Sequence, residues 1–176
     1  LSLGEPDFVT PPDIRESAKK AIDEGFTFYT PIAGFADLRQ AISDKFKFEN
    51  GLDYAIDQIV VSTGAKQSIA NVILSLVNPG EEVVVPTPYW VSYSQMIKLA
   101  EGVPVFVDAT VETDYKVSAQ QIRKAITTKT KLLIFSSPCN PTGSVYTREE
   151  LREFAKVIAE FEDLYIISDE IYEYIN

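Results

Sequence analysis

Short runs of β-branched and aliphatic residues alternate with segments of helical periodicity along most of the chain, and this alternation limits the folds open to it. The runs lack the strict apolar and polar alternation of strands with one solvated face, so they indicate strands buried on both sides. Buried strands separated by helices form parallel sheets covered on both faces. We therefore predict an α/β fold, a three-layer α/β/α arrangement around a mainly parallel sheet. The predicted strands are 58–63, 81–87, 103–107, 131–137 and 164–169.

Helical periodicity fills the segments between and before these strands. The first helix is predicted after Pro11-Pro12 and ends before Gly25, because proline is favoured at a helix start and glycine at its end. The segments predicted as helices are 11–25, 35–51, 66–77, 90–100, 118–126 and 148–161. An apolar content of 45% in 176 residues is enough to build a buried core.

Composition excludes several classes of function. The chain has no histidine and one cysteine, Cys139, so it can hold neither a Cys/His metal cluster nor a Ser-His-Asp triad nor an internal disulfide. We expect no metal site. A net charge of −10 disfavours nucleic acid and acidic membranes as partners. There is no apolar stretch of about 18 residues and no basic leader, so we expect no membrane span and a cytoplasmic protein.

Unusual polar and aromatic residues gather where the predicted strands end. The strand ends run into "STGAKQ", "PTPYW", "SSPCNPTG" and "SDEIY", whereas the strand middles are Val, Ile, Leu and Phe. In an open parallel sheet, ligands bind just beyond the carboxyl ends of the strands, because loops and helix N-termini meet there. The four strand ends therefore predict one shared ligand-binding rim.

Each of these strand ends has a functional and a purely structural interpretation. The N–H groups at 62–67 could hold a phosphate, or Ser62/Thr63 could be an ordinary N-cap. Trp90 could lie against a planar ligand or belong to the core. Asn140 stands between two prolines, in a turn that could include a cis bond and aim its amide, or simply be rigid. Asp169 could be a helix N-cap or a surface carboxylate, or a partly desolvated carboxylate that needs a cation such as a protonated heterocyclic nitrogen.

Six segments together resemble a known family. "SLGEPDF", "YTPIAG", "STGAKQ", "PTPYWVSY", "SSPCNPTG" and "SDEIYE" occur in the order and approximate spacing of the class I/II aminotransferases, which are fold-type I enzymes dependent on pyridoxal 5′-phosphate (PLP). The resemblance covers essentially the whole chain and is strongest to bacterial aspartate aminotransferases. It implies that 31–176 form part of a fold-type I large domain. It also implies that 1–30 contribute to the small domain and to dimer contacts.

The resemblance implies a role for residues at the predicted rim. Asp169 would pair with the pyridine nitrogen of PLP and keep it protonated, and Tyr172 and Asn140 would bond to the 3-hydroxyl oxygen. Trp90 would stack on the ring. The implied cofactor-binding residues are Gly64, Ala65, Lys66, Trp90, Asn140, Asp169, Tyr172 and Tyr29, of which Asp169 and Tyr172 are also implied to be catalytic.

Further implied roles concern substrate and partner. Tyr29 resembles a tyrosine that reaches the phosphate in the neighbouring subunit, which implies a homodimer with shared sites. Lys66 resembles a lysine facing the distal carboxylate of the substrate, although a solvated lysine at a helix start is the plain alternative. We therefore expect an acidic amino acid as donor and a 2-oxo acid as acceptor. The implied substrate-binding residues are Gly4, Lys66, Trp90 and Asn140. Cys139 departs from the family pattern and receives no role.

Two other functions are compatible with these residues. One is another PLP-dependent reaction on the same scaffold, such as a C–S lyase, and the other is a non-catalytic PLP-binding regulatory domain. The family's Schiff-base lysine and its phosphate-binding and carboxylate-binding arginines lie beyond the "SDEIYEYIN" segment. We therefore expect these 176 residues to be an N-terminal fragment that is inactive alone.

Overall fold

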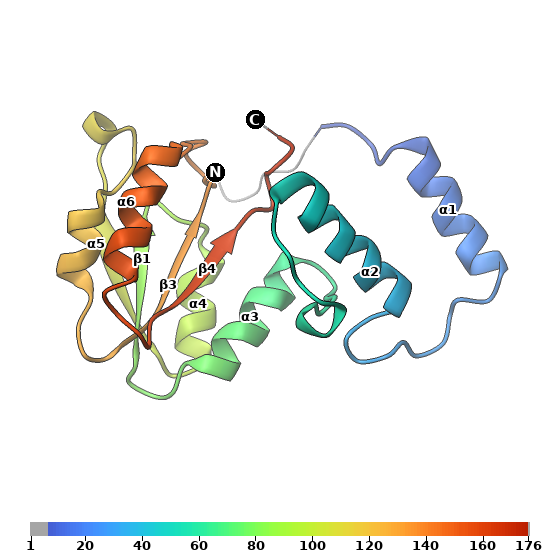
Figure 1. Ribbon diagram of the computed structural model, residues 1–176, viewed down its shortest axis with the longest axis horizontal. Helices are drawn as coiled ribbons and strands as arrows, with labels where there is room; N and C mark the ends of the chain where they lie inside the picture. The colour runs from blue at the N-terminus through green and yellow to red at the C-terminus, as the bar shows by residue number, and fades with distance from the viewer. Residues whose placement is uncertain (1–6, 176) are drawn as a thin grey trace. The chain divides into compact units, whose positions relative to one another are not determined.

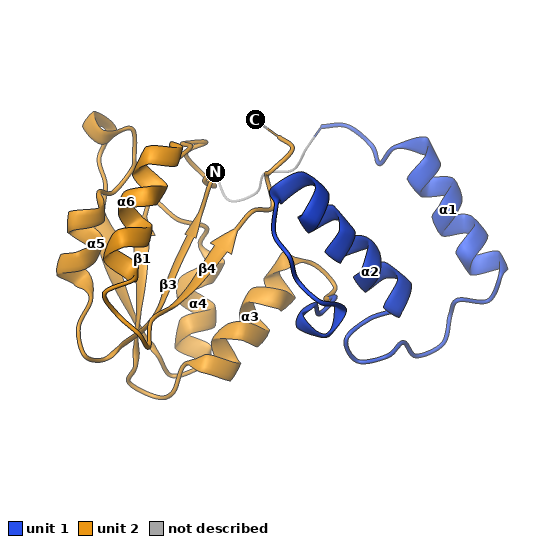
Figure 2. Cartoon of the chain, viewed as in Figure 1, with its two compact units in different colours: residues 1–61 blue, residues 62–176 orange. Residues whose placement is uncertain are grey.

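The computed structural model describes residues 7–175 and divides into two compact units, one ending at Val61 and one beginning at Ser62 (Figure 2). The first unit contains α1 (Pro12–Asp23), α2 (Ala36–Lys45), a π-helical turn (Phe46–Asn50) and a short 3-10 helix (Ile56–Gln58). Neither α1 nor α2 buries any of its residues, and Ile14 and Ile22 of α1 are 55% and 64% exposed. The assignment of 1–30 and 31–176 to different domains of the complete protein stays a prediction.

The second unit is a four-stranded parallel sheet with helices on both faces, which confirms the predicted fold class (Figure 1). The strand order is β2-β1-β3-β4, and every neighbouring pair is parallel. None of the helices within the described residues is long and apolar enough to cross a membrane. The elements are α3 (Ala65–Leu76), β1 (Glu82–Thr87), α4 (Ser92–Leu99), β2 (Val103–Asp108), a 3-10 helix (Val111–Thr113), α5 (Ala119–Ala125), β3 (Thr130–Ser136), α6 (Arg148–Ile158) and β4 (Tyr165–Asp169).

Alternate residues of the central strands build two separate halves of the core. Val83 and Val85 of β1 pack with residues of α3 and α4, whereas Val84 packs with residues of α5 and α6. All three valines are 0% exposed. Burying an aliphatic side chain of this size stabilises a fold by about 1.5–3 kcal/mol, so a strand buried on both faces contributes on both sides. This two-sided burial explains why the strands read as continuous apolar runs.

The predicted strand at 58–63 was wrong. The segment begins at Gln58, the last residue of the short 3-10 helix, and Ile59 has extended backbone angles. Among the described residues, however, the segment pairs with no strand of the sheet. Its backbone is tied instead to a turn, by a hydrogen bond of 3.0 Å from the Val61 N–H to the Ala33 carbonyl oxygen. β-branched residues favour an extended backbone, but a strand also needs a neighbour to complete its ladder.

The strand order creates a switch point between β1 and β3. The chain leaves β1 through α4, on the face lined by Val83, and leaves β3 through α6, on the opposite face. The two loops therefore diverge just beyond the carboxyl ends of adjacent strands. In open α/β sheets this divergence opens the crevice where ligands bind. Three strand ends, those of β1, β3 and β4, carry predicted site residues, rather than the four expected.

Candidate functional site

The carboxylate of Asp169 lies at the carboxyl end of β4 and is 9% exposed. Its Oδ2 atom accepts a hydrogen bond of 2.6 Å from the phenol of Tyr93, which comes from α4 on the far side of the switch point. Its Oδ1 atom accepts a longer bond of 3.3 Å from the N–H of Ile171. The bond from Ile171 is the local turn contact expected of an aspartate at a strand end. The bond from Tyr93 comes from a different element, α4, and satisfies a buried carboxylate.

The start of α3 offers backbone donors near this carboxylate. Gly64 precedes the helix at a φ of 99°, which a residue with a side chain rarely adopts. None of the described residues accepts a hydrogen bond from the N–H groups of Ala65 and Lys66. Such free N–H groups at the positive end of a twelve-residue helix can hold an anion.

One surface hollow joins the start of α3 to the end of β4. It is lined by Ala65 and Ser68 of α3 and by Ser168 and Asp169 at the end of β4. An anion-holding helix end and a buried carboxylate therefore border the same space. A ligand spanning this hollow would need a negative group at one end and a positive group at the other.

Lys66 and Trp90 lie together at the same rim. The Lys66 Nζ atom is 5.0 Å from the centroid of the Trp90 ring, a cation–π distance. The indole also packs edge to face against Tyr93, with ring centroids 5.6 Å apart and planes at 90°. Lys66 is exposed and Trp90 half-buried, so the lysine keeps its charge at the surface while the indole anchors in the core.

The turn after β3 carries Asn140 and is tied to the turn after β4. The Asn140 Nδ2 atom donates a hydrogen bond of 3.2 Å to the Tyr172 phenol oxygen. The peptide bonds before Pro138 and Pro141 are cis, as the sequence allowed. Two of the predicted site residues are thus direct partners, although 32 positions separate them in the sequence.

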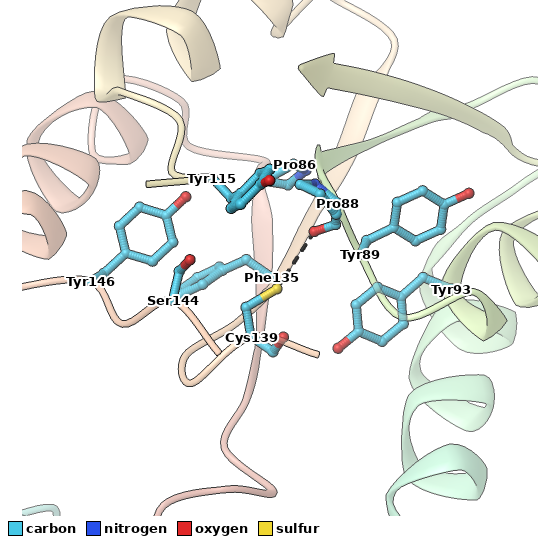
Figure 3. A pocket seen from close by; sticks show the side chains of 10 residues that line it. Pro86, Pro88, Tyr89, Tyr93, Tyr115, Phe135, Cys139, Ser144 and Tyr146 are labelled. Atoms are coloured by element: carbon cyan, nitrogen blue, oxygen red, sulfur yellow. Dashed lines mark hydrogen bonds between the residues drawn. The ribbon is translucent and has the colours of Figure 1, made fainter. Parts of the chain in front are cut away.

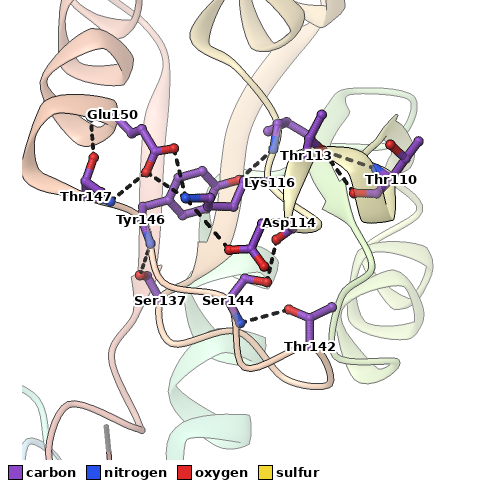
Figure 4. A network of polar contacts seen from close by, with 11 residues as sticks. Thr110, Thr113, Asp114, Lys116, Ser137, Thr142, Ser144, Tyr146, Thr147 and Glu150 are labelled. Carbon is purple, nitrogen blue, oxygen red and sulfur yellow. Dashed lines mark hydrogen bonds and ion pairs between the residues drawn. The ribbon is translucent and has the colours of Figure 1, made fainter.

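A polar network fixes the rest of this turn against the loop before α5 (Figure 4). The Ser144 hydroxyl donates to the Asp114 carbonyl oxygen at 2.6 Å, and the Tyr146 N–H donates to the Ser137 hydroxyl at 3.0 Å. Lys116 and Glu150 form an ion pair at 3.0 Å beside them. Because both ends of the turn are held, Asn140 sits on a braced segment rather than on a free loop.

Aromatic rings fill the switch point itself (Figure 3). The pocket beyond β1 and β3 is lined by Tyr89, Tyr93, Tyr115 and Tyr146, and the Cys139 thiol points at the Pro88 carbonyl oxygen, 3.5 Å away. Burial raises the pKa of Tyr146 to about 12, although a hydrogen bond from the Val117 N–H works in the opposite direction.

The Tyr93 phenol keeps its proton strongly. Burial first, and then the hydrogen bond to Asp169 and its charge, raise the pKa of Tyr93 far above its ordinary value of 10. A hydrogen bond with Ser136 lowers it in part. The phenol is therefore a hydrogen-bond donor at and well above neutral pH.

The structure brings most of the predicted site residues to one end of the sheet. Gly64, Ala65 and Lys66 stand at the start of α3, and Asp169 borders the same hollow as Ala65. Tyr29 belongs to the first compact unit and its side chain is fully exposed, and Gly4 lies outside the described residues. The roles that the resemblance gives to these residues stay predictions.

Sequence reasoning missed Tyr93. Its signal was present, because it stands three positions after Trp90 and so shares that residue's side of the α4 start. The sequence does not say which of Tyr89, Tyr93 and Tyr115 points at Asp169, which lies 76 positions after Tyr93.

Comparison with known proteins decides the family. The family model described as aminotransferase class I and II matches residues 1–175. The chain belongs to the class I and II aminotransferases. It is 51% identical over 176 residues to the "Probable aspartate/prephenate aminotransferase" of Rickettsia conorii, covering 100% of this chain and 44% of that relative.

Solved structures of this family share the fold. The aspartate aminotransferase of Thermus thermophilus with maleate matches with a TM-score of 0.93 and 44% identity, over 97% of this chain and 44% of that one. The aromatic aminotransferase of Pyrococcus horikoshii matches with a TM-score of 0.90 and 43% identity, over 96% and 45%. The parallel sheet is thus that of the fold-type I large domain, and the chain spans less than half the length of these relatives.

The described residues fit PLP, the cofactor of this family, by the chemistry of their donor set. PLP carries a phosphate, a ring nitrogen that takes a proton, and an oxygen on the ring. The free N–H groups of Ala65 and Lys66 suit the phosphate, and the buried carboxylate of Asp169 suits a protonated nitrogen. The Asn140 amide and the Tyr172 phenol can both donate to an oxygen.

Proposed function

We propose that the complete protein is a PLP-dependent transaminase that moves the amino group of an acidic amino acid to a 2-oxo acid. The observation that carries the proposal is the buried Asp169 carboxylate, held by Tyr93 beside the free N–H groups of α3. When bound, PLP supplies an electron-withdrawing ring that stabilises the carbanion at the α-carbon of the amino acid.

The side chains of this chain would bind and orient that cofactor. Asp169 would accept a hydrogen bond from the ring nitrogen and favour its charged form, because an adjacent carboxylate stabilises a cation. Asn140 and Tyr172 would donate to the ring oxygen, and Trp90 would cover one face of the ring and exclude water from it.

Lys66 supports an acidic substrate. Its ammonium group is exposed at the rim and lies over the Trp90 ring, so it could meet a carboxylate at the far end of a bound amino acid. The relatives include aspartate aminotransferases, and the solved structure of one of them is described as containing maleate, which is a dicarboxylate. They also include an aromatic aminotransferase at nearly the same identity, so overall similarity alone does not choose the substrate.

A homodimer with shared sites, in the cytoplasm, completes the proposal. Three apolar or aromatic side chains of the first compact unit, those of Phe28, Tyr29 and Ile32, are 87%, 106% and 101% exposed. Apolar surface of this kind is typical of protein interfaces. It supports the proposal that Tyr29 reaches the cofactor of a second subunit.

The proposal is tested by assaying the complete protein with PLP, aspartate and 2-oxoglutarate. We expect oxaloacetate and glutamate to form in equal amounts. Release of pyruvate and a thiol from a cysteine conjugate, without amino transfer, would indicate the C–S lyase instead. PLP binding without turnover of any amino acid would indicate a regulatory domain.

A further inference from the structure

Tyr93 lies at the centre of the switch point, fully enclosed by the core. Its side chain is 1% exposed and packs with residues of α3, α4, β1 and β3. A phenylalanine would fill the same space without placing a hydroxyl group there. The hydroxyl has a definite acceptor, the Asp169 Oδ2 atom at 2.6 Å, a distance typical of a charge-assisted O–H···O⁻ hydrogen bond.

The two oxygens of Asp169 are held very differently. Oδ2 takes the short bond from the Tyr93 phenol, whereas Oδ1 takes a bond of 3.3 Å from the Ile171 N–H. A charge-assisted bond at 2.6 Å is much the stronger of the two. The rotation of the carboxylate about its side-chain bond is therefore set mainly by Tyr93, which leaves Oδ1 with spare acceptor capacity beside the hollow shared with α3.

We propose that Tyr93 is a positioning residue, which orients the Asp169 carboxylate toward the ring nitrogen of the cofactor without touching the cofactor itself. The proposal rests on the proposed function, because it needs a ligand with a basic ring nitrogen. The Tyr93 O–H group donates to the carboxylate, and burial keeps this phenol from ionising, so the orientation does not change with pH around neutrality. The Tyr93 ring also packs edge to face on Trp90, so this one side chain would fix the orientation of both the Asp169 carboxylate and the Trp90 indole.

A purely structural tyrosine would behave differently from a positioning one. Loss of a core hydrogen bond would weaken all ligands alike, through lower stability or a loosened site. Loss of an oriented carboxylate would weaken only ligands that have a ring nitrogen for Asp169 to meet. The distinction therefore lies in comparing two ligands that differ at that one atom.

The experiment uses the complete protein with Tyr93→Phe, and compares PLP with its 1-deaza analogue, in which a carbon replaces the ring nitrogen. We expect the dissociation constant for PLP to rise about tenfold, since a hydrogen bond to a charged group contributes on this scale. The constant for the analogue should not change. Transamination should lose kcat with little change in KM. Tyr89→Phe, which removes a phenol from the same pocket and leaves the Tyr93–Asp169 hydrogen bond in place, is the matched control and should change neither constant.

Each outcome bears on a separate claim. Equal weakening of PLP and its analogue by Tyr93→Phe, with transamination intact in the parent protein, would overturn this inference alone. Failure of the parent protein to bind PLP would overturn the proposed function and the inference with it. If Tyr93→Phe does not fold, fluorotyrosine at position 93 keeps the shape of the side chain and strengthens the donor. The fluorotyrosine variant should then change the dissociation constant for PLP and leave that for the 1-deaza analogue unchanged. Identical effects on the two constants would overturn the inference.

Discussion

Asn140 and Tyr172 join the ends of two neighbouring strands, because the amide Nδ2 atom donates to the phenol oxygen at 3.2 Å. Asn140 follows β3 and Tyr172 follows β4, and these strands are paired in parallel. The contact leaves the second amide proton and the phenol proton free to meet a third oxygen. Two groups with a donor to spare therefore lie side by side on different turns, because β3 and β4 end next to each other.

This pair should act as one unit in cofactor binding. Asn140→Ala and Tyr172→Phe should each weaken PLP binding by the complete protein about two- to tenfold, because each removes one hydrogen bond. The double variant should lose less than the product of the two single losses, since the partners are in contact. Fluorescence titration with PLP measures all three. Strictly multiplicative losses would mean that the two side chains meet the cofactor independently or not at all.

Asp169→Asn should separate cofactor binding from turnover. The amide keeps the size of the side chain but not its charge, so a ring nitrogen beside it is no longer favoured in its protonated form. The variant should still bind PLP at saturating concentration, with a dissociation constant raised at least as much as in Tyr93→Phe. It should lose transamination on the order of a hundredfold or more, as when a charge-stabilising group is removed from an active site. Single-turnover absorbance with aspartate gives the rate. A variant with nearly normal rates would remove Asp169 from the mechanism.

Much of the fold follows from local periodicity in the sequence. Four of the five predicted strands were confirmed, with β1, β2, β3 and β4 beginning or ending within one residue of the prediction. Two-sided burial gives these strands a pattern that needs no knowledge of their partners. The segment 58–63 has the same residue types, but strand formation there would need a neighbour that the described residues do not provide.

Part of the site was also predictable, because the positions of the strand ends follow from the strand pattern. Asp169 is the last residue of β4 and Asn140 lies in the turn that follows β3, and the ends of parallel strands lie at one edge of a sheet. Tyr93 was not predictable, because its contact depends on how α4 packs against β1 and β3. The approach of Lys66 to Trp90 was likewise missed, because it depends on how the start of α3 lies against the loop between β1 and α4.

Lys66→Ala should raise KM for aspartate more than for alanine or an aromatic donor. The ammonium group can make a charge-assisted contact only with a donor that has a second carboxylate, so the rise for aspartate should be about tenfold. Lys98→Ala removes an exposed lysine of α4 and is the matched control. Steady-state kinetics with the three donors measures the effect. An equal rise for all of them would assign Lys66 to the phosphate or to the Trp90 contact.

Tyr146 should make the protein lose stability at high pH. Burial raises the pKa of Tyr146 from 10 to about 12, so the unfolded chain gives up this proton first as the pH rises. The contribution is fully present below about pH 10 and is lost between about pH 10 and about pH 12. Over that window the free energy of unfolding should fall more steeply than in Tyr146→Phe, by up to about 1.4 kcal/mol per pH unit.

Urea titrations of the complete protein across that window measure the difference in slope. Tyr115→Phe, which removes a phenol that is 40% exposed in the same pocket, is the control and should keep the slope of the parent protein. If Tyr146→Phe keeps the slope as well, the alkaline loss belongs to other groups.

Borohydride reduction should attach pyridoxal to a lysine outside residues 1–176 of the complete protein. Lys66 is the lysine of this chain that lies beside Trp90, so it is the natural competitor for such a label. Its Nζ atom, however, is directed over the indole ring at 5.0 Å, and it stands at the start of α3, where the backbone N–H groups suit the phosphate rather than the reactive end of the cofactor. A cation there is better placed to meet an anion than to form a covalent bond. Peptide mapping after reduction should therefore find Lys66 unmodified, and Lys66→Ala should keep a full equivalent of bound label. Recovery of the label on Lys66, and its loss in Lys66→Ala, would make Lys66 the covalent anchor and would require a new assignment of the phosphate end of the site.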